Sequence, residues 1–202
     1  MSQSSEVKFP LAVDGPVKLH LEAVGTRDRF QLLSRFATVT QAKMAVESNL
    51  EALAQTVLYN LEHQHDWTEL RIHRLPGLSR PLISGLPPRR LYVHPDEQIE
   101  IIMAEKDREE RIPQPPEFEW VLPTHLAEKW SIKAFAQVFD AVDPVPPSDN
   151  PQESTDLEDE DAQWKQWRSQ KRGKRILLST VQDDSTVTYY LMHDGIVKPR
   201  QN

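Results

Sequence analysis

Histidine residues are the first groups in this chain that could do chemistry, since imidazole can bind a metal or transfer a proton near neutral pH. His63 and His65 are followed by Asp66, and His73 and His94 come further along the chain. Two ligands on one helical face need a spacing of four residues, whereas His63 and His65 are two apart. We therefore predict structural or surface roles for the histidines and no metal site.

Other catalytic patterns have little support in the sequence. The chain has six glycines and no cysteine, and it contains no G-x-S-x-G nucleophile turn, P-loop or dinucleotide-binding glycine pattern. The lack of cysteine excludes disulfides, thiol catalysis and cysteine-based zinc sites. We predict no catalytic residues and no cofactor.

Basic residues gather in two stretches. Residues 70–95 include five arginines and no acid, and residues 165–175 include six basic residues beside two tryptophans. Such stretches can bind phosphate groups by charge and bases by stacking. The alternatives are an ordinary arginine-rich surface and a flexible segment that balances an acidic neighbour. The candidate RNA contacts are Arg71, Arg74, Arg89, Arg90, Lys171 and Arg172.

Two adjacent carboxylates, Asp183 and Asp184, lie in a run of turn-forming residues between two strand-like segments, 175–181 and 186–192. The pattern predicts a β-hairpin whose aspartates accept hydrogen bonds from nearby backbone. Both faces of the second segment are largely apolar or aromatic, which predicts a strand that is central in a sheet or covered by another chain. Alternation puts Val187, Tyr189 and Leu191 on one face, and Thr188, Tyr190 and Met192 on the other.

The elements that position these groups follow from hydrophobic spacing. Val46, Leu50, Leu53, Val57 and Leu61 recur at intervals of three or four and predict a helix over 40–63. Shorter patterns predict strands at 67–75, 90–94, 98–103 and 119–122, a break at 84–88, and a helix at 124–142.

Composition and charge set the organisation of the 202-residue chain. Hydrophobic residues are 38 %, prolines outnumber glycines by 16 to 6, and the formal charge is −7. We predict one α+β domain made of residues 38–142 and 172–199, interrupted by a charged, proline-rich, disordered insertion at 143–171. The N-terminal segment 1–37 gives no clear pattern.

Cellular location is predicted from what the sequence lacks. No stretch approaches the ~20 apolar residues that a membrane helix needs, and residues 1–10 have no apolar signal core. We expect an intracellular protein, nuclear or cytoplasmic, that is neither secreted nor membrane-spanning.

The terminal run from Ile176 to Gly195 resembles the C-terminal end of tRNA-splicing endonuclease subunits, and within them the small structural subunit of the eukaryotic enzyme. The resemblance rests on the acidic turn 183–186, on Tyr189-Tyr190 and on Asp194-Gly195. It implies an endonuclease-like C-terminal domain, with a mixed sheet flanked by helices and a terminal hairpin. It also implies a heterotetramer of two catalytic and two structural subunits that excises introns from precursor tRNA.

The resemblance further implies roles for the hairpin. Asp183 and Asp184 would insert into a basic cleft of a catalytic subunit, subunit two, and residues 187–192 would form a strand interface with subunit thirty-four. Precursor tRNA would be contacted only within the complex, and the isolated chain could form a homodimer through the same strand.

Catalytic members of the family use a tyrosine, a histidine and a lysine, and this chain departs from that pattern. Lys171 or Lys174 stands near the position of the lysine, but His125, predicted to begin a helix, is in the wrong context. The resemblance therefore implies a non-catalytic subunit. Two alternatives stay open: a stand-alone RNA-binding module, and a nuclease that uses Lys174 with His94 or His125.

Overall fold

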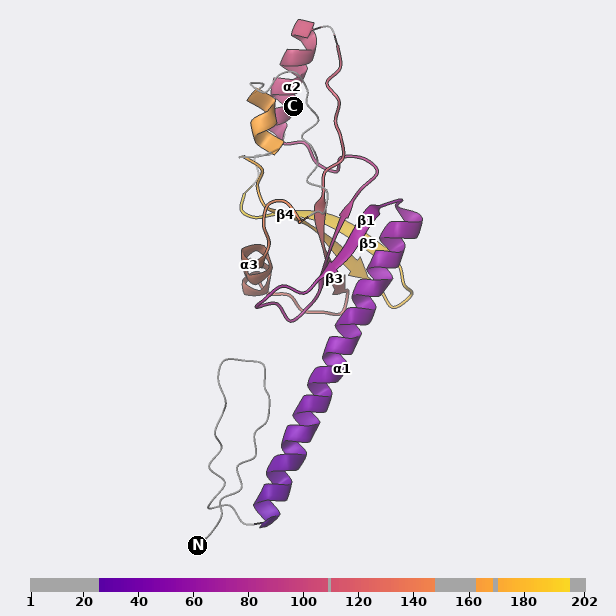
Figure 1. The fold of residues 1–202 in the computed structure, drawn as a ribbon, viewed down its shortest axis with the longest axis vertical. Helices are drawn as coiled ribbons and strands as arrows, with labels where there is room; N and C mark the ends of the chain where they lie inside the picture. Colours follow the sequence, from indigo (N-terminus) through magenta and orange to yellow (C-terminus); the bar gives the residue numbers. More distant parts are fainter. Residues whose placement is uncertain (1–25, 109, 148–162, 169–170, 197–202) are drawn as a thin grey trace. The chain divides into compact units, whose positions relative to one another are not determined.

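The computed structural model describes residues 26–108, 110–147, 163–168 and 171–196 (Figure 1). The chain divides into two units, residues 1–45 and residues 46–202. Most of the N-terminal segment and of the charged insertion, residues 1–25 and 148–162, lies outside the described residues. A single helix, α1 (Thr26–Gln64), begins in the first unit and ends in the second.

A five-stranded sheet forms the centre of the second unit. Its strands are β1 (Thr68–His73), β2 (Leu82–Leu86), β3 (Glu119–His125), β4 (Arg175–Val181) and β5 (Val187–His193), and they lie in this order across the sheet. The β3–β4 pair is parallel and the other pairs are antiparallel. The predicted α+β fold is confirmed: a mixed sheet flanked by helices, ending in a β-hairpin.

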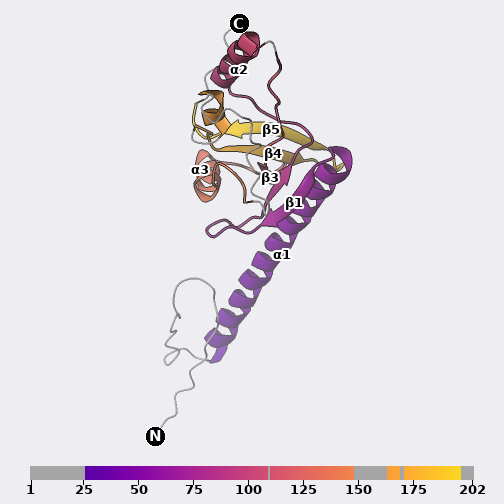
Figure 2. The same ribbon diagram turned by 45° about the horizontal axis from the view of Figure 1, so that its top comes forward.

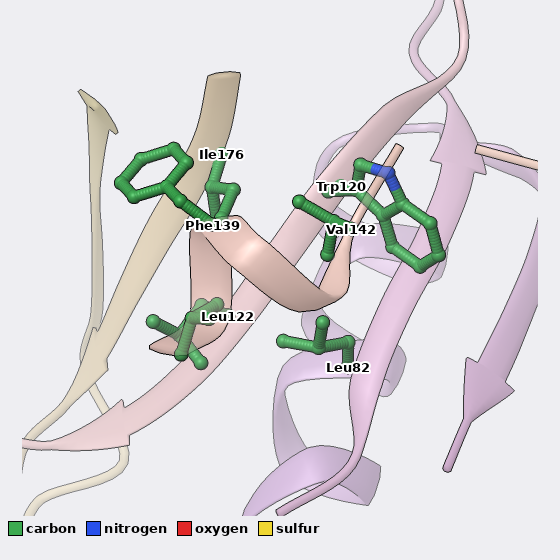
Figure 3. Close-up of a cluster of buried hydrophobic side chains, with 7 residues drawn as sticks. Leu82, Trp120, Leu122, Phe139, Val142 and Ile176 are labelled. Carbon is green, nitrogen blue, oxygen red and sulfur yellow. The ribbon is translucent and has the colours of Figure 1, made fainter. Parts of the chain in front are cut away.

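Helix α3 (Ile132–Ala141) covers one face of the sheet. Val138 and Phe139 of this helix pack with Trp120 and Leu122 of β3 and with Ile176 of β4 (Figure 3). The helix begins at an N-cap serine, Ser131, whose Oγ accepts a hydrogen bond from the Ala134 amide at 3.2 Å. Full burial of each large apolar side chain in this cluster contributes about 1.5–3 kcal/mol relative to exposure.

The C-terminal part of α1 covers the opposite face (Figure 2). Val57 and Leu61 pack against Trp67, Ile83 and Val121 and are essentially inaccessible to solvent. Val46, at the start of the predicted apolar stripe, is 57 % exposed. The predicted helix over 40–63 therefore exists but begins earlier, at Thr26, and the apolar stripe is buried only towards its C-terminal end.

A third, smaller cluster lies away from the sheet. Helix α2 (Pro95–Arg108) contacts the 3₁₀ helix η1 (Gln163–Arg168), and Ile101 of α2 packs with Ile112 and Trp164. Trp164 is 4 % exposed. Residues 163–168, which we expected within a disordered insertion, are thus a 3₁₀ helix with a buried tryptophan.

Four predicted elements differ from the structure, and α2 replaces one of them. The predicted strand 98–103 is helical: Pro95 opens the helix and Asp96 and Glu97 lie in its first turn, which favours a helix start. Of the isoleucines that suggested a strand, Ile101 is buried while Ile99 and Ile102 are exposed.

The predicted break at 84–88 is also wrong, because β2 continues to Leu86. Gly85 lies within this strand where a Cβ atom would come 2.6 Å from Leu70 Cδ2 and 3.1 Å from Trp67 Cε3. The glycine therefore allows a close approach of neighbouring side chains and does not mark a turn.

The helix predicted at 124–142 divides into two elements. Strand β3 runs on through Pro123 to His125, and α3 begins only at Ile132. Pro123 is tolerated because β3 pairs with β2 only through Glu119, Trp120 and Val121, so the proline lies beyond that ladder. The predicted strand at 90–94 lies instead in the connection between β2 and α2.

Candidate interaction surfaces

The tip of the terminal hairpin is a three-residue loop. The Ser185 amide donates to the Gln182 carbonyl at 3.0 Å, and the Gln182 amide donates to the Thr186 carbonyl at 2.9 Å. Ser185 has a φ of 66°, in the left-handed region that glycine prefers. A turn followed by one left-handed residue is a common hairpin connection, and it holds both aspartates at the tip.

The two aspartates have different surroundings. Asp183 is 98 % exposed, and its Oδ1 lies 3.1 Å from Nε2 of His125. Asp184 Oδ1 accepts a hydrogen bond from the Thr186 amide at 2.9 Å. This bond, made by the backbone and supported by the Thr186 side chain, lowers the pKa of Asp184 below its usual value. Both carboxylates are exposed at the tip and are therefore accessible to a binding partner.

Strand β5, which follows the tip, is the last strand in the order of the sheet. Tyr189 faces α1, and its hydroxyl donates to Asn60 Oδ1 at 2.6 Å. Burial raises the pKa of Tyr189. Tyr190 points to the opposite face and is 56 % exposed. We predicted that this strand is either central in a sheet or covered by another chain; in the structure it lies at the edge of the sheet and is not central.

A buried ion network joins β3, β4, α2 and η1. Glu117, Glu119 and Glu97 lie within 4 Å of the guanidinium groups of four arginines. The arginines are Arg90, Arg168, Arg172 and Arg175. Among the described residues, four guanidinium groups face three carboxylates, so this part of the network has one positive charge in excess.

Two of the candidate RNA contacts, Arg90 and Arg172, are buried in this network. The side chains of Arg90 and Arg172 are both 3 % exposed. Arg90 lies 2.7 Å from Glu97 Oε1, and Arg172 donates to Glu117 Oε2 at 2.7 Å and to the Phe118 carbonyl at 2.7 Å. In this structure, therefore, these two arginines contact carboxylates and carbonyls within the chain and form no part of a basic surface.

Burial and the neighbouring charges shift the pKa values of three of these arginines. Burial and then the charge of Arg175 lower the pKa of Arg172, and burial and then the charge of Arg90 lower that of Arg168. Burial also acts to lower the pKa of Arg175, but its hydrogen bonds to Glu119 and the charges of both glutamates outweigh that effect and raise it.

The other predicted basic residues lie elsewhere. Arg71 is in β1, and Arg74, just after that strand, pairs with Glu51 of α1 at 2.6 Å. Arg89 is exposed in the connection between β2 and α2. The acid-free stretch in the sequence does not become one continuous basic surface, because acids from other elements approach it.

One pocket brings together residues from distant parts of the sequence. It is lined by Lys171 and Lys174, by Tyr92 and His94, and by His193 and Trp167. His193 ends β5 and Trp167 lies in η1, about 70–100 residues from Tyr92 in the sequence. No local pattern would have placed His193 here, because only the pairing of β5 with β4 brings it to the pocket.

His125 lies apart from that pocket. It ends strand β3 and approaches Asp183 at the hairpin, so the predicted helical context is wrong. The Nζ of Lys174 donates to the Phe139 carbonyl at 2.8 Å. Lys174 and His94 share the pocket lining, whereas His125 belongs to the hairpin end of the sheet.

The described part of the chain contains neither a cluster of metal-binding side chains nor a helix that could span a membrane. Among its residues, no three histidine or acidic side chains are grouped so that they could hold a metal ion. Likewise, none of the helices in this part is long and apolar enough to cross a membrane. His73 has a structural contact, since its Nε2 lies 2.7 Å from Ser84 Oγ on the adjacent strand.

These features define a small α+β protein whose buried charges pair internally and whose exposed carboxylates lie at the end of an edge hairpin. Comparison with known proteins is more specific. A family model described as Sen15 protein matches residues 56–202, so the chain belongs to the Sen15 family. The resemblance to the small structural subunit, subunit fifteen, is thereby confirmed.

Three relatives agree with this assignment. A probable tRNA-splicing endonuclease subunit, tsp-1, of Neurospora crassa is 64 % identical over 161 residues, which cover 80 % of this chain and 70 % of the relative. A probable tRNA-splicing endonuclease subunit sen15 of Schizosaccharomyces pombe is 29 % identical over 67 % of this chain and 73 % of its own length. The subunit SEN15 of Eremothecium gossypii is 25 % identical over 79 % of this chain and its own full length.

Proposed function

We propose that this chain is a non-catalytic, structural subunit of a tRNA-splicing endonuclease, which supports assembly of the enzyme for intron excision from precursor tRNA. The observation that carries the proposal is its similarity to relatives that are named as subunits of this endonuclease, one of them 64 % identical. Its contribution is to hold the other subunits in place, and the cleavage chemistry belongs to them.

The strand interface is assigned to β5. An edge strand has unpaired backbone groups on its outer side, which can continue a sheet into a second chain. Tyr190 adds an exposed aromatic side chain beside that edge. We assign residues 187–192 to pairing with a partner subunit, subunit thirty-four, and the same edge to homodimer formation when the chain is isolated.

The acidic hairpin is assigned to a second contact. Asp183 and Asp184 are exposed at the tip, where a basic cleft of another subunit, subunit two, can receive them. A carboxylate that becomes enclosed beside arginine or lysine forms strong charge-assisted hydrogen bonds. When the hairpin enters the cleft, Asp183 loses its contact with His125 and pairs with basic groups of the other subunit.

Co-expression with the other subunits tests the proposal. The tagged chain should co-purify with them, the complex should cleave an intron-containing precursor tRNA, and the chain alone should not. Cleavage by the isolated chain would instead favour a nuclease with its own site. Failure to co-purify with any subunit would contradict the structural role.

Substitution of Tyr190 by lysine tests the strand interface. Tyr190→Lys places a charge on an exposed position of the edge, so the fold should be retained while co-purification of the strand partner falls. Tyr190→Phe is the matched control because it keeps the ring. Equal recovery of the partner with both variants would mean that β5 is not part of the interface.

A further inference from the structure

The pocket between α2, η1 and the start of β4 has the chemistry of a binding site for an anion that carries a ring. Its lining includes four cationic side chains, Lys171, Arg172, Lys174 and Arg175, and two carboxylates, Glu97 and Asp194. Glu97, Arg172 and Arg175 belong to the buried network, in which the two arginines pair with Glu117 and Glu119. The charges of the lining outside the network are therefore those of Lys171, Lys174 and Asp194. Asp194 is exposed at the surface. The pocket is therefore positive.

The buried ion network does not supply a negative charge that would cancel the positive charge of the pocket. In the part of the chain that the structure describes, the buried network has one more guanidinium group than carboxylates, and the ammonium of Lys174 is held by a backbone carbonyl, which carries no formal charge. A buried surplus of charge is costly unless a counter-charge approaches it. A phosphate group at the mouth of the pocket would supply that counter-charge.

Aromatic rings alternate with these cations. His94 and Trp167 are stacked, with centroids 4.2 Å apart and planes 10° apart, and the rings of Tyr92 and His193 are 4.5 Å apart. Lys171 is exposed and its Nζ lies 4.8 Å from the centre of the Trp167 ring. Cations interleaved with aromatic faces are typical of proteins that bind single-stranded nucleic acid.

One hydroxyl in the lining lacks a contact. Among the described residues, the hydroxyl of Tyr92 is buried without a hydrogen-bond partner. An unsatisfied buried donor costs free energy, which a ligand oxygen would recover. Tyr92 itself lines the same pocket as the stacked rings and the two lysines.

We infer that this pocket binds single-stranded RNA, with a phosphate held by Lys171 and Lys174 and a base stacked on Trp167. The exposed side chain of Lys171 moves away from the Trp167 ring to bind the phosphate. The base then stacks on the ring face that Lys171 has left. The inference does not depend on the assembly role, since the isolated full-length chain is sufficient to test it.

An acidic peptide segment of a partner is the competing occupant, and the observations favour RNA. A peptide carboxylate would pair with the lysines but would make no use of the stacked rings of His94 and Trp167. RNA uses both the charge and the rings. The isolated pocket offers few contacts, so we expect weak affinity at low salt, with a Kd of about 1–100 μM, in the range of non-specific nucleic-acid binding.

Fluorescence anisotropy with a labelled eight-nucleotide single-stranded RNA of mixed sequence tests the inference. Lys171→Ala should weaken binding by roughly fivefold or more and reduce the salt dependence by about one counterion. Arg89→Ala is the matched control, since it removes one exposed basic side chain outside the pocket and should change the affinity by less than about twofold. Equal losses in the two variants would overturn the proposal.

The stacking step needs its own variant and competitors. Trp167→Leu should weaken binding by roughly fivefold to a hundredfold, in a protein whose near-UV circular dichroism and melting temperature show a folded chain. Inorganic polyphosphate and an acidic peptide should compete more weakly than unlabelled RNA of equal charge. Competition by either of them as strong as by RNA would overturn the proposal, because a plain anion site or a peptide site would then explain the data.

Discussion

The two ends of strand β4 use charge in opposite ways. At its start, Arg175 is 5 % exposed and bonds to Glu119 and Glu117 of the neighbouring chain segment. At its end, the strand leads into a turn where Asp183 is 98 % exposed and contacts only one side chain, His125, among those the structure describes. The charges at the start of the strand are used to hold the fold, whereas those at the hairpin remain available to another molecule.

The difference matters because a buried charge that loses its partner is costly, whereas an exposed one is solvated in either state. Substitutions at the start of β4 should therefore change stability, and substitutions at the hairpin should change assembly.

Glu119→Ala should produce the largest loss. It leaves the guanidinium groups of Arg175 and Arg172 buried without this carboxylate, and the free energy of unfolding should fall by about 3–5 kcal/mol. Urea denaturation followed by circular dichroism measures the change. The control is Glu51→Ala, which removes the partner of the exposed Arg74 and should cost less than about 1 kcal/mol. Similar losses in both variants would mean that the network is not structurally important.

The two tyrosines of β5 provide the next contrast. Tyr189→Phe removes the donor to the buried oxygen of Asn60 and should lower the free energy of unfolding by about 1–2 kcal/mol. Tyr190→Phe changes an exposed hydroxyl and should have an effect within about 0.5 kcal/mol. If the same denaturation experiment gave a larger loss for Tyr190→Phe, our account of which face of β5 is buried would be wrong.

Ser185→Gly should have the opposite sign. Ser185 holds a φ of 66°, which costs a residue with a Cβ atom more than it costs glycine. We expect a gain of about 0.5 kcal/mol, measured as a rise in melting temperature. A decrease would show that the strain at this position is smaller than the added flexibility of the unfolded chain.

The smallest effect should be the pH dependence of the hairpin. The Thr186 amide lowers the pKa of Asp184 from an unfolded value of 3.8, so its stabilising effect is present above that pH and is lost as the pH falls through the lower, folded value. An NMR titration of the side-chain carboxyl should show the lowered pKa, and Thr186→Pro, which removes the amide proton, should return it towards 3.8. An unchanged pKa in that variant would exclude the hydrogen bond as the cause.

Local sequence patterns predicted the parts of the fold that depend on nearby residues. The terminal hairpin and the helix that ends at Gln64 follow from turn residues and from one apolar stripe. Helix α2 was mistaken for a strand because three isoleucines in six residues fit either period, and only the packing of Ile101 decides between them.

The ion network and the pocket could not be predicted in the same way. Arg172 and Glu117 are 55 residues apart in the sequence, and the parallel pairing of β3 with β4 brings them together. Arg90 and Arg172 look like surface residues in a basic stretch until these carboxylates are located. Only the long-range strand pairing therefore shows which arginines are buried in the ion network and which are exposed.

Assembly of the complex with an Asp183→Ala/Asp184→Ala hairpin tests whether these exposed carboxylates serve assembly and not folding. The subunits would be co-expressed and the assembled species identified by native mass spectrometry, with the unfolding of the isolated variant followed in parallel. We predict that the tetramer is lost or strongly reduced while the unfolding midpoint in urea stays close to that of the unmodified chain. An undiminished tetramer would contradict the account.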